Sequence, residues 1–147
     1  MKPKTILLVE DNPDEEELAL RALRKSGVNT GVKVVRDGQE ALDYLFCEGL
    51  YQGRDISNIP EVIFLDIKLP KLNGLEVLRK IRADQRSQLI PVVLLTSSDE
   101  ESDMVAGYSC GANSYIKKPF DFNEFVEQIK VLGKYWLGIN RTPQAQH

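Results

Sequence analysis

Residues 5–15, TILLVEDNPDE, place a run of apolar side chains directly before two neighbouring carboxylates, Glu10 and Asp11. Like charges this close repel each other, and burying either of them costs free energy. The pair therefore either lies in water as part of an ordinary turn or surrounds a bound cation. The rest of the sequence decides between these interpretations, because it determines the fold in which the run ends.

Four more short apolar runs follow the first one along the chain. The runs at 5–9, 62–65 and 91–95 are continuous rather than alternating, which is typical of strands covered on both faces. The other two, VKVV and SYI, lie at 32–35 and 114–116. These five runs are the predicted strands.

Helical patterns separate the runs. The segment 14–26 carries acids in its first turn and bases in its last, and both favour the helix dipole. DGQE at 37–40 and SDEE at 98–101 have the spacing of capping boxes that open further helices. Apolar residues recur at helical spacing in 74–85 and from Asp121 onward. Strands and helices thus alternate, which predicts a parallel sheet with helices on both faces.

The bulk properties favour a single globular domain. The chain has 147 residues, 42% of them hydrophobic and 28% charged. We predict one domain over 1–147, with a core over 4–137, an exposed loop over 48–60 and a flexible tail over 138–147. A net charge of -3 argues against nucleic acid as the main partner. Apolar stretches are too short for a signal peptide or a membrane span, so we expect a cytoplasmic protein with no membrane contact.

Charged and polar side chains follow the predicted strands at their carboxyl ends, where functional groups of a doubly wound sheet gather. Glu10 and Asp11 end the first strand, and Asp66 ends the third. Thr96 ends the fourth strand, and Lys118 follows the fifth. If the first and third strands are neighbours, three carboxylates meet at one mouth, opposite a hydroxyl and an ammonium group.

Such a mouth suits a divalent cation and a phosphoryl group. Three close carboxylates cannot all stay ionised without a cation, and an oxygen site with room for water suits Mg²⁺. The metal and Lys118 would offset the charge of a phosphoryl group approaching Asp66, where a carboxylate nucleophile forms an aspartyl phosphate. Taken singly, each residue has a simpler explanation as a solvated turn, a helix cap or a surface lysine. Their joint placement favours the site.

Four motifs carry a specific resemblance: LLVEDN, LDIKLPKLNG, LLTSS and YIKKPF. With them the chain resembles the receiver domains of two-component response regulators over roughly residues 4–137. The resemblance implies a flavodoxin-like doubly wound (βα)5 fold, class α/β, with a five-stranded parallel sheet of order 2-1-3-4-5. It also implies that Asp66 is the phosphoacceptor and that Glu10, Asp11 and Asp66 hold Mg²⁺, or Mn²⁺ as a substitute, together with the backbone carbonyl of Lys68.

The same resemblance assigns roles to the hydroxyl and the lysine. Lys118 pairs with the phosphoryl group, and the Thr96 hydroxyl binds that group once it has arrived. Tyr115 matches an aromatic switch that turns inward when the hydroxyl moves; the alternative is an ordinary edge-strand tyrosine. The bond between Lys118 and Pro119 is often cis in this family.

The implied function is signalling rather than enzymatic catalysis. Asp66 would take a phosphoryl group from a sensor histidine kinase, and phosphotransfer and dephosphorylation would be self-catalysed. The 48–60 loop, LPKLNG and KYWLG make the chain most similar to stand-alone regulators of cyanobacterial phytochrome kinases. Output would then pass through contacts with an unidentified downstream protein. Tyr135 and Trp136 either belong to the core or extend an apolar face for a homodimer.

Three other functions are weighed against this one. A flavin carrier of similar fold would want neutral backbone donors in its first loop, whereas EDNPDEEE is acidic. A phosphatase of the haloacid dehalogenase type needs a second acid two residues past the nucleophile, where Lys68 stands. A degenerate receiver acting only as a scaffold would not need an intact acceptor, metal seat and lysine.

Overall fold

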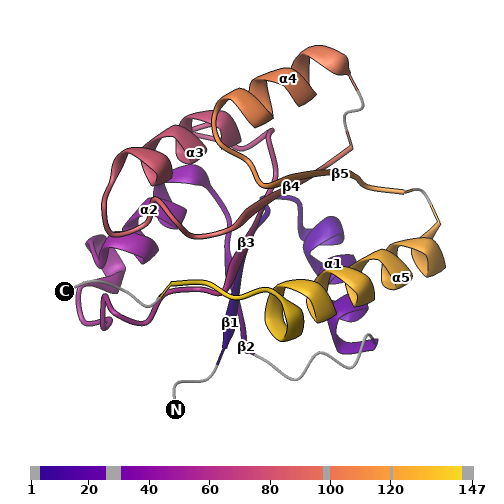
Figure 1. Ribbon diagram of the computed structural model, residues 1–147, viewed down its shortest axis with the longest axis horizontal. Coiled ribbons are helices and arrows are strands. Elements are labelled where there is room, and N and C mark those ends of the chain that lie inside the picture. The colour runs from indigo at the N-terminus through magenta and orange to yellow at the C-terminus, as the bar shows by residue number, and fades with distance from the viewer. Residues whose placement is uncertain (1–3, 26–30, 98–99, 120, 144–147) are drawn as a thin grey trace.

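The sheet confirms the predicted fold class and strand order. The computed structural model describes residues 4–25, 31–97, 100–119 and 121–143 (Figure 1). Its strands form one parallel sheet in the order β2-β1-β3-β4-β5. The strands are β1 (Thr5–Val9), β2 (Gly31–Val35), β3 (Val62–Leu65), β4 (Val92–Thr96) and β5 (Ser114–Lys117).

The helices cover both faces of this sheet. In Figure 1, α1 and α5 lie on one side of the strands, and α2, α3 and α4 lie on the other. A short 3-10 turn, η1, follows α2, and a π-helical segment, η2, continues α5. The bounds are α1 (Pro13–Lys25), α2 (Gly38–Phe46), η1 (Gly49–Tyr51), α3 (Gly74–Ala83), α4 (Glu101–Ser109), α5 (Phe122–Gly133) and η2 (Lys134–Ile139).

The continuous apolar strands are buried on both faces because each face has its own core. Successive side chains of a strand point to opposite faces of the sheet. In β1, Leu7 packs with the buried residues of α2 and α3, whereas Leu8 packs with those of α1 and α5. Trp136 belongs to this second core and is only 8% exposed. The core interpretation of Trp136 is therefore confirmed.

Of the two predicted helix N-caps, the structure describes the one at Asp37 and not the one at Ser98. Asp37 caps α2 by accepting a hydrogen bond from the Glu40 backbone N–H at 2.7 Å. The Glu40 carboxylate accepts from the backbone N–H of Arg36 at 2.8 Å, one residue before the cap, so the Asp37 half of the predicted capping box is confirmed and its return bond lies at the neighbouring residue. The other predicted cap, Ser98, lies outside the described residues. There α4 begins after Glu100, whose side chain makes no capping hydrogen bond.

The 48–60 loop is exposed at its tip and anchored behind it. Leu50 in η1 is 96% exposed. Arg54, by contrast, donates to the carbonyls of Tyr44 and Asn58, at 2.8 and 2.7 Å. Its guanidinium also lies 4.2 Å from the centroid of the Tyr44 ring. The Tyr51 hydroxyl also donates to the Glu40 carboxylate at 2.6 Å, so the loop is attached to α2 by both Arg54 and Tyr51.

The C-terminal segment is described beyond the end of the predicted core at residue 137. The η2 segment runs through Ile139, and the Thr142 hydroxyl lies 3.4 Å from the Glu61 carboxylate. Lys4 donates to the backbone carbonyl of Leu137 on the same side. The domain limits and the flexibility of the tail stay predictions, and residues 144–147 lie outside the described residues.

Candidate phosphoryl and metal site

The register of the sheet brings the predicted site residues to one edge. Val9 of β1 pairs with Leu65 of β3, so the residues that follow these strands, Glu10 and Asp66, emerge side by side. Thr96 pairs with Lys117 at the ends of β4 and β5. The backbone N–H of Lys118 then donates to the Thr96 carbonyl at 2.7 Å. The lysine is thereby fixed at the same edge as the acids.

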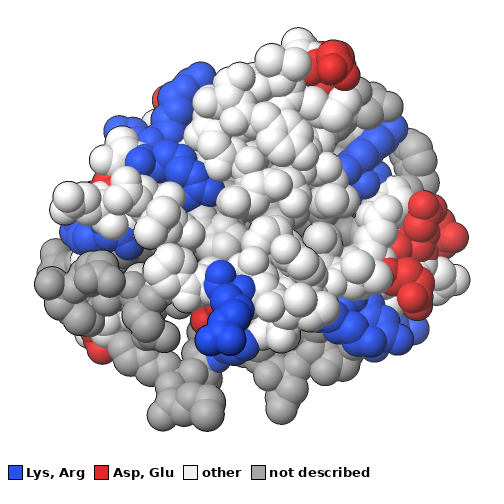
Figure 2. All heavy atoms as spheres, viewed as in Figure 1, with Lys and Arg blue, Asp and Glu red and all other residues white. Residues whose placement is uncertain are grey.

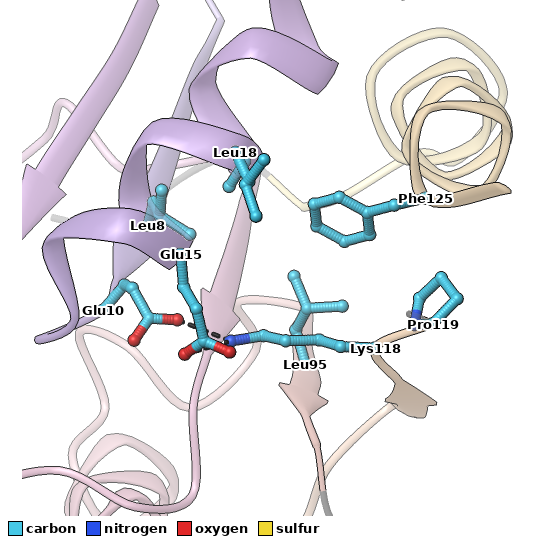
Figure 3. Close-up of a pocket in the computed structure, with 9 residues that line it drawn as sticks. Leu8, Glu10, Glu15, Leu18, Leu95, Lys118, Pro119 and Phe125 are labelled. Carbon is cyan, nitrogen blue, oxygen red and sulfur yellow. Dashed lines mark hydrogen bonds and ion pairs between the residues drawn. The ribbon is translucent and has the colours of Figure 1, made fainter. Parts of the chain in front are cut away.

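The Lys118 ammonium is the centre of the site (Figure 3). Its Nζ lies 2.6 Å from Glu10 Oε1, 3.3 Å from Glu15 Oε2 and 3.4 Å from Asp66 Oδ2. In the close-up, the Glu10 and Glu15 carboxylates point toward the end of the lysine side chain. One positive charge therefore faces three carboxylates.

Burial makes this excess of negative charge costly. The side chains of Glu10 and Asp66 are 4% and 10% exposed. Burial raises the pKa of the Glu10 carboxyl above its ordinary value, although Lys118 opposes the shift. Burial likewise raises the pKa of the Asp66 carboxyl, again against the attraction of Lys118. Both carboxylates would gain from a further cation.

The pKa of Lys118 is set by two opposing influences, burial and the surrounding carboxylates. Burial by itself would lower the pKa of the Lys118 ammonium, because burial disfavours the charged form. The carboxylates of Asp66, Glu10 and Glu15 outweigh burial and raise the pKa above its ordinary value. Lys118 is therefore a permanent cation at neutral pH.

The loop after β3 holds the Asp66 side chain from behind. The backbone N–H of Lys68 donates to Asp66 Oδ1 at 3.1 Å, which leaves Oδ2 on the side of Lys118. Gly74 then brings the first turn of α3 against this loop. A Cβ at Gly74 would lie 2.2 Å from the Asp66 carbonyl oxygen, so any side chain here would displace the loop.

Glu15 was missed by the sequence analysis as a site residue. Its carboxylate oxygen lies within 4.8 Å of those of Glu10 and Asp66. The acids of the first turn of α1 were explained by the helix dipole alone. Glu15, however, is the third residue of α1, the helix that follows directly on the strand end carrying Glu10. Its place in the first turn after that strand is the signal that could have identified it.

Two predicted metal ligands stand apart from this group. Asp11 is exposed, and its carboxylate is not among the three that converge in the described part of the chain. Lys68 is also exposed, and the structure relates it to Asp66 through its N–H. Both assignments stay predictions.

The two predicted switch residues lie on the strands beyond Asp66. Thr96 is buried at the end of β4, with 1% of its surface exposed. Tyr115 is partly buried in β5, where it pairs with Leu94 and packs against the core on the α2 and α3 side. The described residues contain no cis peptide bond. The bond between Lys118 and Pro119 is thus trans, contrary to expectation, in the form that X–Pro bonds prefer without opposing contacts.

A small hollow of about 70 Å³ opens beside the ion pairs, between α1 and α5. Leu18, Leu95 and Phe125 form part of its apolar wall, and Glu15 and Lys118 line its charged end (Figure 3). Side chains at this end therefore have space beside them.

The donor set fits a divalent cation. Carboxylate oxygens are the ligands that Mg²⁺ and Mn²⁺ prefer. Glu10 and Asp66 are buried, converge to within 4.8 Å with Glu15, and have raised pKa values that a cation would relieve. The acidic cluster is thus compatible with binding of a divalent metal.

A family model for the response regulator receiver domain matches residues 6–130. The chain belongs to this family. The described part of the receiver has no helix long and apolar enough to cross a membrane. Family membership also decides against the flavin carrier and the dehalogenase-type phosphatase.

Two curated relatives match this receiver over nearly all of its length. It is 41% identical to the probable methanogenesis regulatory protein FilR2 of Methanothrix harundinacea, covering 96% of this chain and 88% of FilR2. It is 34% identical to the response regulator Rcp1 of Synechocystis, covering 97% of this chain and 95% of Rcp1.

Solved structures of similar regulators share the fold. The phosphorylated cyanobacterial phytochrome response regulator RcpA is 38% identical, with a TM-score of 0.88 and coverage of 97% of this chain and 99% of RcpA. The Mn²⁺-bound form of Rcp1 is 33% identical, with a TM-score of 0.86 and coverage of 96% and 99%. A phosphorylated and a metal-bound form thus occur among proteins similar to this receiver.

Proposed function

We propose that this receiver takes a phosphoryl group onto Asp66 from a sensor histidine kinase and signals by protein contacts in a two-component phosphorelay. The observation that carries the proposal is the position of Lys118, whose Nζ lies 3.4 Å from Asp66 Oδ2. A cation thus stands beside the carboxylate on which negative charge would grow during transfer.

The transfer forms one bond and breaks another. An Asp66 oxygen attacks the phosphorus of a phosphohistidine, in line with the P–N bond. As the O–P bond forms, the P–N bond breaks, and the imidazole nitrogen keeps its electron pair and takes a proton from water. Lys118 offsets the charge on the phosphoryl oxygens.

A divalent cation, when bound, would supply further positive charge to those oxygens. We propose Mg²⁺, with Mn²⁺ as a substitute, held by Glu10, Asp11, Asp66 and the Lys68 carbonyl. The convergence of the buried Glu10 and Asp66 carboxylates with that of Glu15 to within 4.8 Å supports this assignment, because a cation would offset their mutual repulsion.

Phosphorylation would then move the two switch residues. The acyl phosphate carries about two negative charges, enough to draw the Thr96 hydroxyl toward it. Tyr115 would follow inward and shift an existing equilibrium of the surface formed by α4, β5 and α5. Support comes from packing: a Cβ placed on Gly107 of α4 would lie 3.5 Å from the Tyr115 ring. Motion of that ring would therefore reach α4.

Incubation with acetyl phosphate and Mg²⁺ tests the phosphoacceptor. Intact-mass spectrometry should show a gain of one phosphoryl group, absent in Asp66→Asn and retained in Asp14→Asn, a change at an exposed aspartate of α1. No gain by the wild type would overturn the proposal and favour a receiver that acts only as a scaffold.

A phytochrome is the kinase that we propose as the partner. The likeness to RcpA, a phytochrome response regulator, supports it, whereas FilR2 is named for methanogenesis. Phosphotransfer from a panel of purified histidine kinases should be fastest from a phytochrome kinase. Faster transfer from another class would replace this assignment.

Output is proposed to pass through a downstream protein or a homodimer. The face between α4 and α5 carries few charged side chains in its middle (Figure 2). Val131, Tyr135 and Ile139, on α5 and its extension, are each at least 46% exposed. Sedimentation should show a dimer that Tyr135→Ser weakens and Leu89→Ser, an exposed change after α3, does not. A monomer at all concentrations, with and without phosphorylation, would exclude the dimer.

A further inference from the structure

The three carboxylates around Lys118 differ in how readily each could leave it. The Glu10 and Asp66 side chains are 4% and 10% exposed, and each also accepts a backbone hydrogen bond, from Asn12 and Lys68. The Glu15 side chain is 36% exposed and lies 3.3 Å from the ammonium. Glu15 would therefore regain water on leaving, whereas the other two would not.

The position of Glu15 allows this movement. Its helix, α1, begins at Pro13, so the side chain reaches the site from the rim rather than from the end of a strand. The hollow between α1 and α5 lies beside it, with Glu15 and Lys118 among its lining residues. In Figure 3 the Glu15 side chain descends from α1 to the end of Lys118. Rotation about its own bonds would take its carboxylate away from the lysine.

The negative charge of a phosphoryl group on Asp66 would favour movement of Glu15 away from Lys118. A phosphoryl group on Asp66 would compete with Glu15 for the same ammonium and would repel the Glu15 carboxylate. We propose that Glu15 is a positioning residue that holds Lys118 in the unphosphorylated receiver and yields it to the phosphoryl group, so that Glu15 weakens the site's affinity for phosphoryl groups. This inference rests on the proposed function of Asp66 and Lys118.

Fluoroberyllate, a phosphoryl analogue that binds aspartate carboxylates, provides the test at saturating Mg²⁺. Glu15→Gln keeps the size of the side chain and removes its charge, so the dissociation constant for fluoroberyllate should fall by about tenfold, as expected for loss of one nearby like charge. Glu15→Asp keeps the charge and should stay within about twofold of the wild type. Calorimetry or ¹⁹F NMR measures both constants.

The matched control is Glu17→Gln. Glu17 lies on the same helix and carries the same charge, but its side chain is 61% exposed and lies 3.7 Å from Arg24. It should leave the fluoroberyllate constant unchanged. An equal gain in Glu15→Gln and Glu17→Gln would overturn the proposal, because net charge alone would then explain the effect.

A second measurement separates a positioning role from that of a metal ligand. The Mg²⁺ dissociation constant is measured without fluoroberyllate in the wild type and Glu15→Gln. The proposal expects a rise of no more than about threefold, since Glu15 would contribute charge near the ion but no metal–oxygen bond. Glu15→Gln weakening both Mg²⁺ and fluoroberyllate strongly would overturn it in favour of a metal ligand.

The failure of this inference is distinguishable from the failure of the proposed function. If the wild type binds fluoroberyllate and takes a phosphoryl group from acetyl phosphate, but Glu15→Gln behaves identically, only the role of Glu15 is wrong. If the wild type does neither, the phosphoacceptor role of Asp66 is wrong, and the role of Glu15 falls with it.

Discussion

Lys118 and Arg82 are cations withdrawn from water at opposite ends of the sheet, and their partners differ in kind. Lys118 faces the carboxylates of Glu10, Glu15 and Asp66. Arg82 instead donates to neutral oxygens near the starts of β4 and β5. These are the carbonyls of Gly111 (2.9 Å), Gln88 (3.0 Å) and Ile90 (2.7 Å) and the side-chain oxygen of Asn113 (2.8 Å).

The difference separates a functional site from a structural one. Burial lowers the pKa of the Arg82 guanidinium, but each of its hydrogen bonds is satisfied without another full charge. Around Lys118 the carboxylates outnumber the cation, so added positive charge would be favourable. At the Arg82 end of the sheet the hydrogen bonds of the cation are satisfied by neutral oxygens. At the Lys118 end an excess of negative charge favours binding of a further cation.

The largest effect is expected from Lys118→Met without divalent ions. Removing one member of a buried charge cluster costs about 3 kcal/mol of unfolding free energy, because the carboxylates are left unpaired. Urea denaturation at pH 7 measures the loss, with Lys80→Met, an exposed lysine of α3, as the control. Millimolar Mg²⁺ should recover most of it. A loss that Mg²⁺ does not change would contradict the charge interpretation of this site.

Arg82→Met should cost somewhat less, roughly 2 kcal/mol, because its acceptors are neutral and partly reach water. Urea denaturation should give the same loss with and without Mg²⁺. Arg79→Met, at an exposed position on the same helix, should be close to neutral. Recovery of Arg82→Met by Mg²⁺ would erase the contrast between the two ends.

Asp66→Asn should stabilise the metal-free receiver. The pKa of Asp66 is raised, so its ionised form is disfavoured in the folded state, and stability falls as pH rises above the ordinary value of 3.8. At pH 7 in EDTA, a neutral asparagine should raise the melting temperature by roughly 2–4 °C. Near pH 3 the gain should vanish, because the carboxyl is then protonated in both states. A lower melting temperature at pH 7 would show that the Lys118 attraction outweighs burial.

This contrast was only half visible in the sequence. The apolar runs predicted a parallel sheet, and the resemblance to receiver domains implied its strand order. With that order, the charged residues after the strands placed Glu10, Asp66 and Lys118 at one edge. The structure brings those three together. Glu15 was missed because an acid early in a helix is already explained by the dipole, and only the phase of α1 turns it toward Lys118. The role of Arg82 depends on backbone carbonyls. Because every residue has one, the residue types in the sequence do not predict which carbonyls Arg82 contacts.

Arg86→Gln should have the smallest effect and extends the comparison to a cation at the surface. Arg86 lies 2.7 Å from Asp84, with its side chain 50% exposed. Its hydrogen bond lowers the pKa of the Asp84 carboxyl, so this stabilisation is present above the ordinary value of 3.8 and is lost as pH falls. Water and salt screen an exposed pair, which limits the loss to less than about 1 kcal/mol. Urea denaturation at low and high salt should show most of it disappearing at high salt, where Arg82→Met keeps its full cost. A salt-insensitive loss as large as that of Arg82→Met would show that exposure does not separate these two arginines.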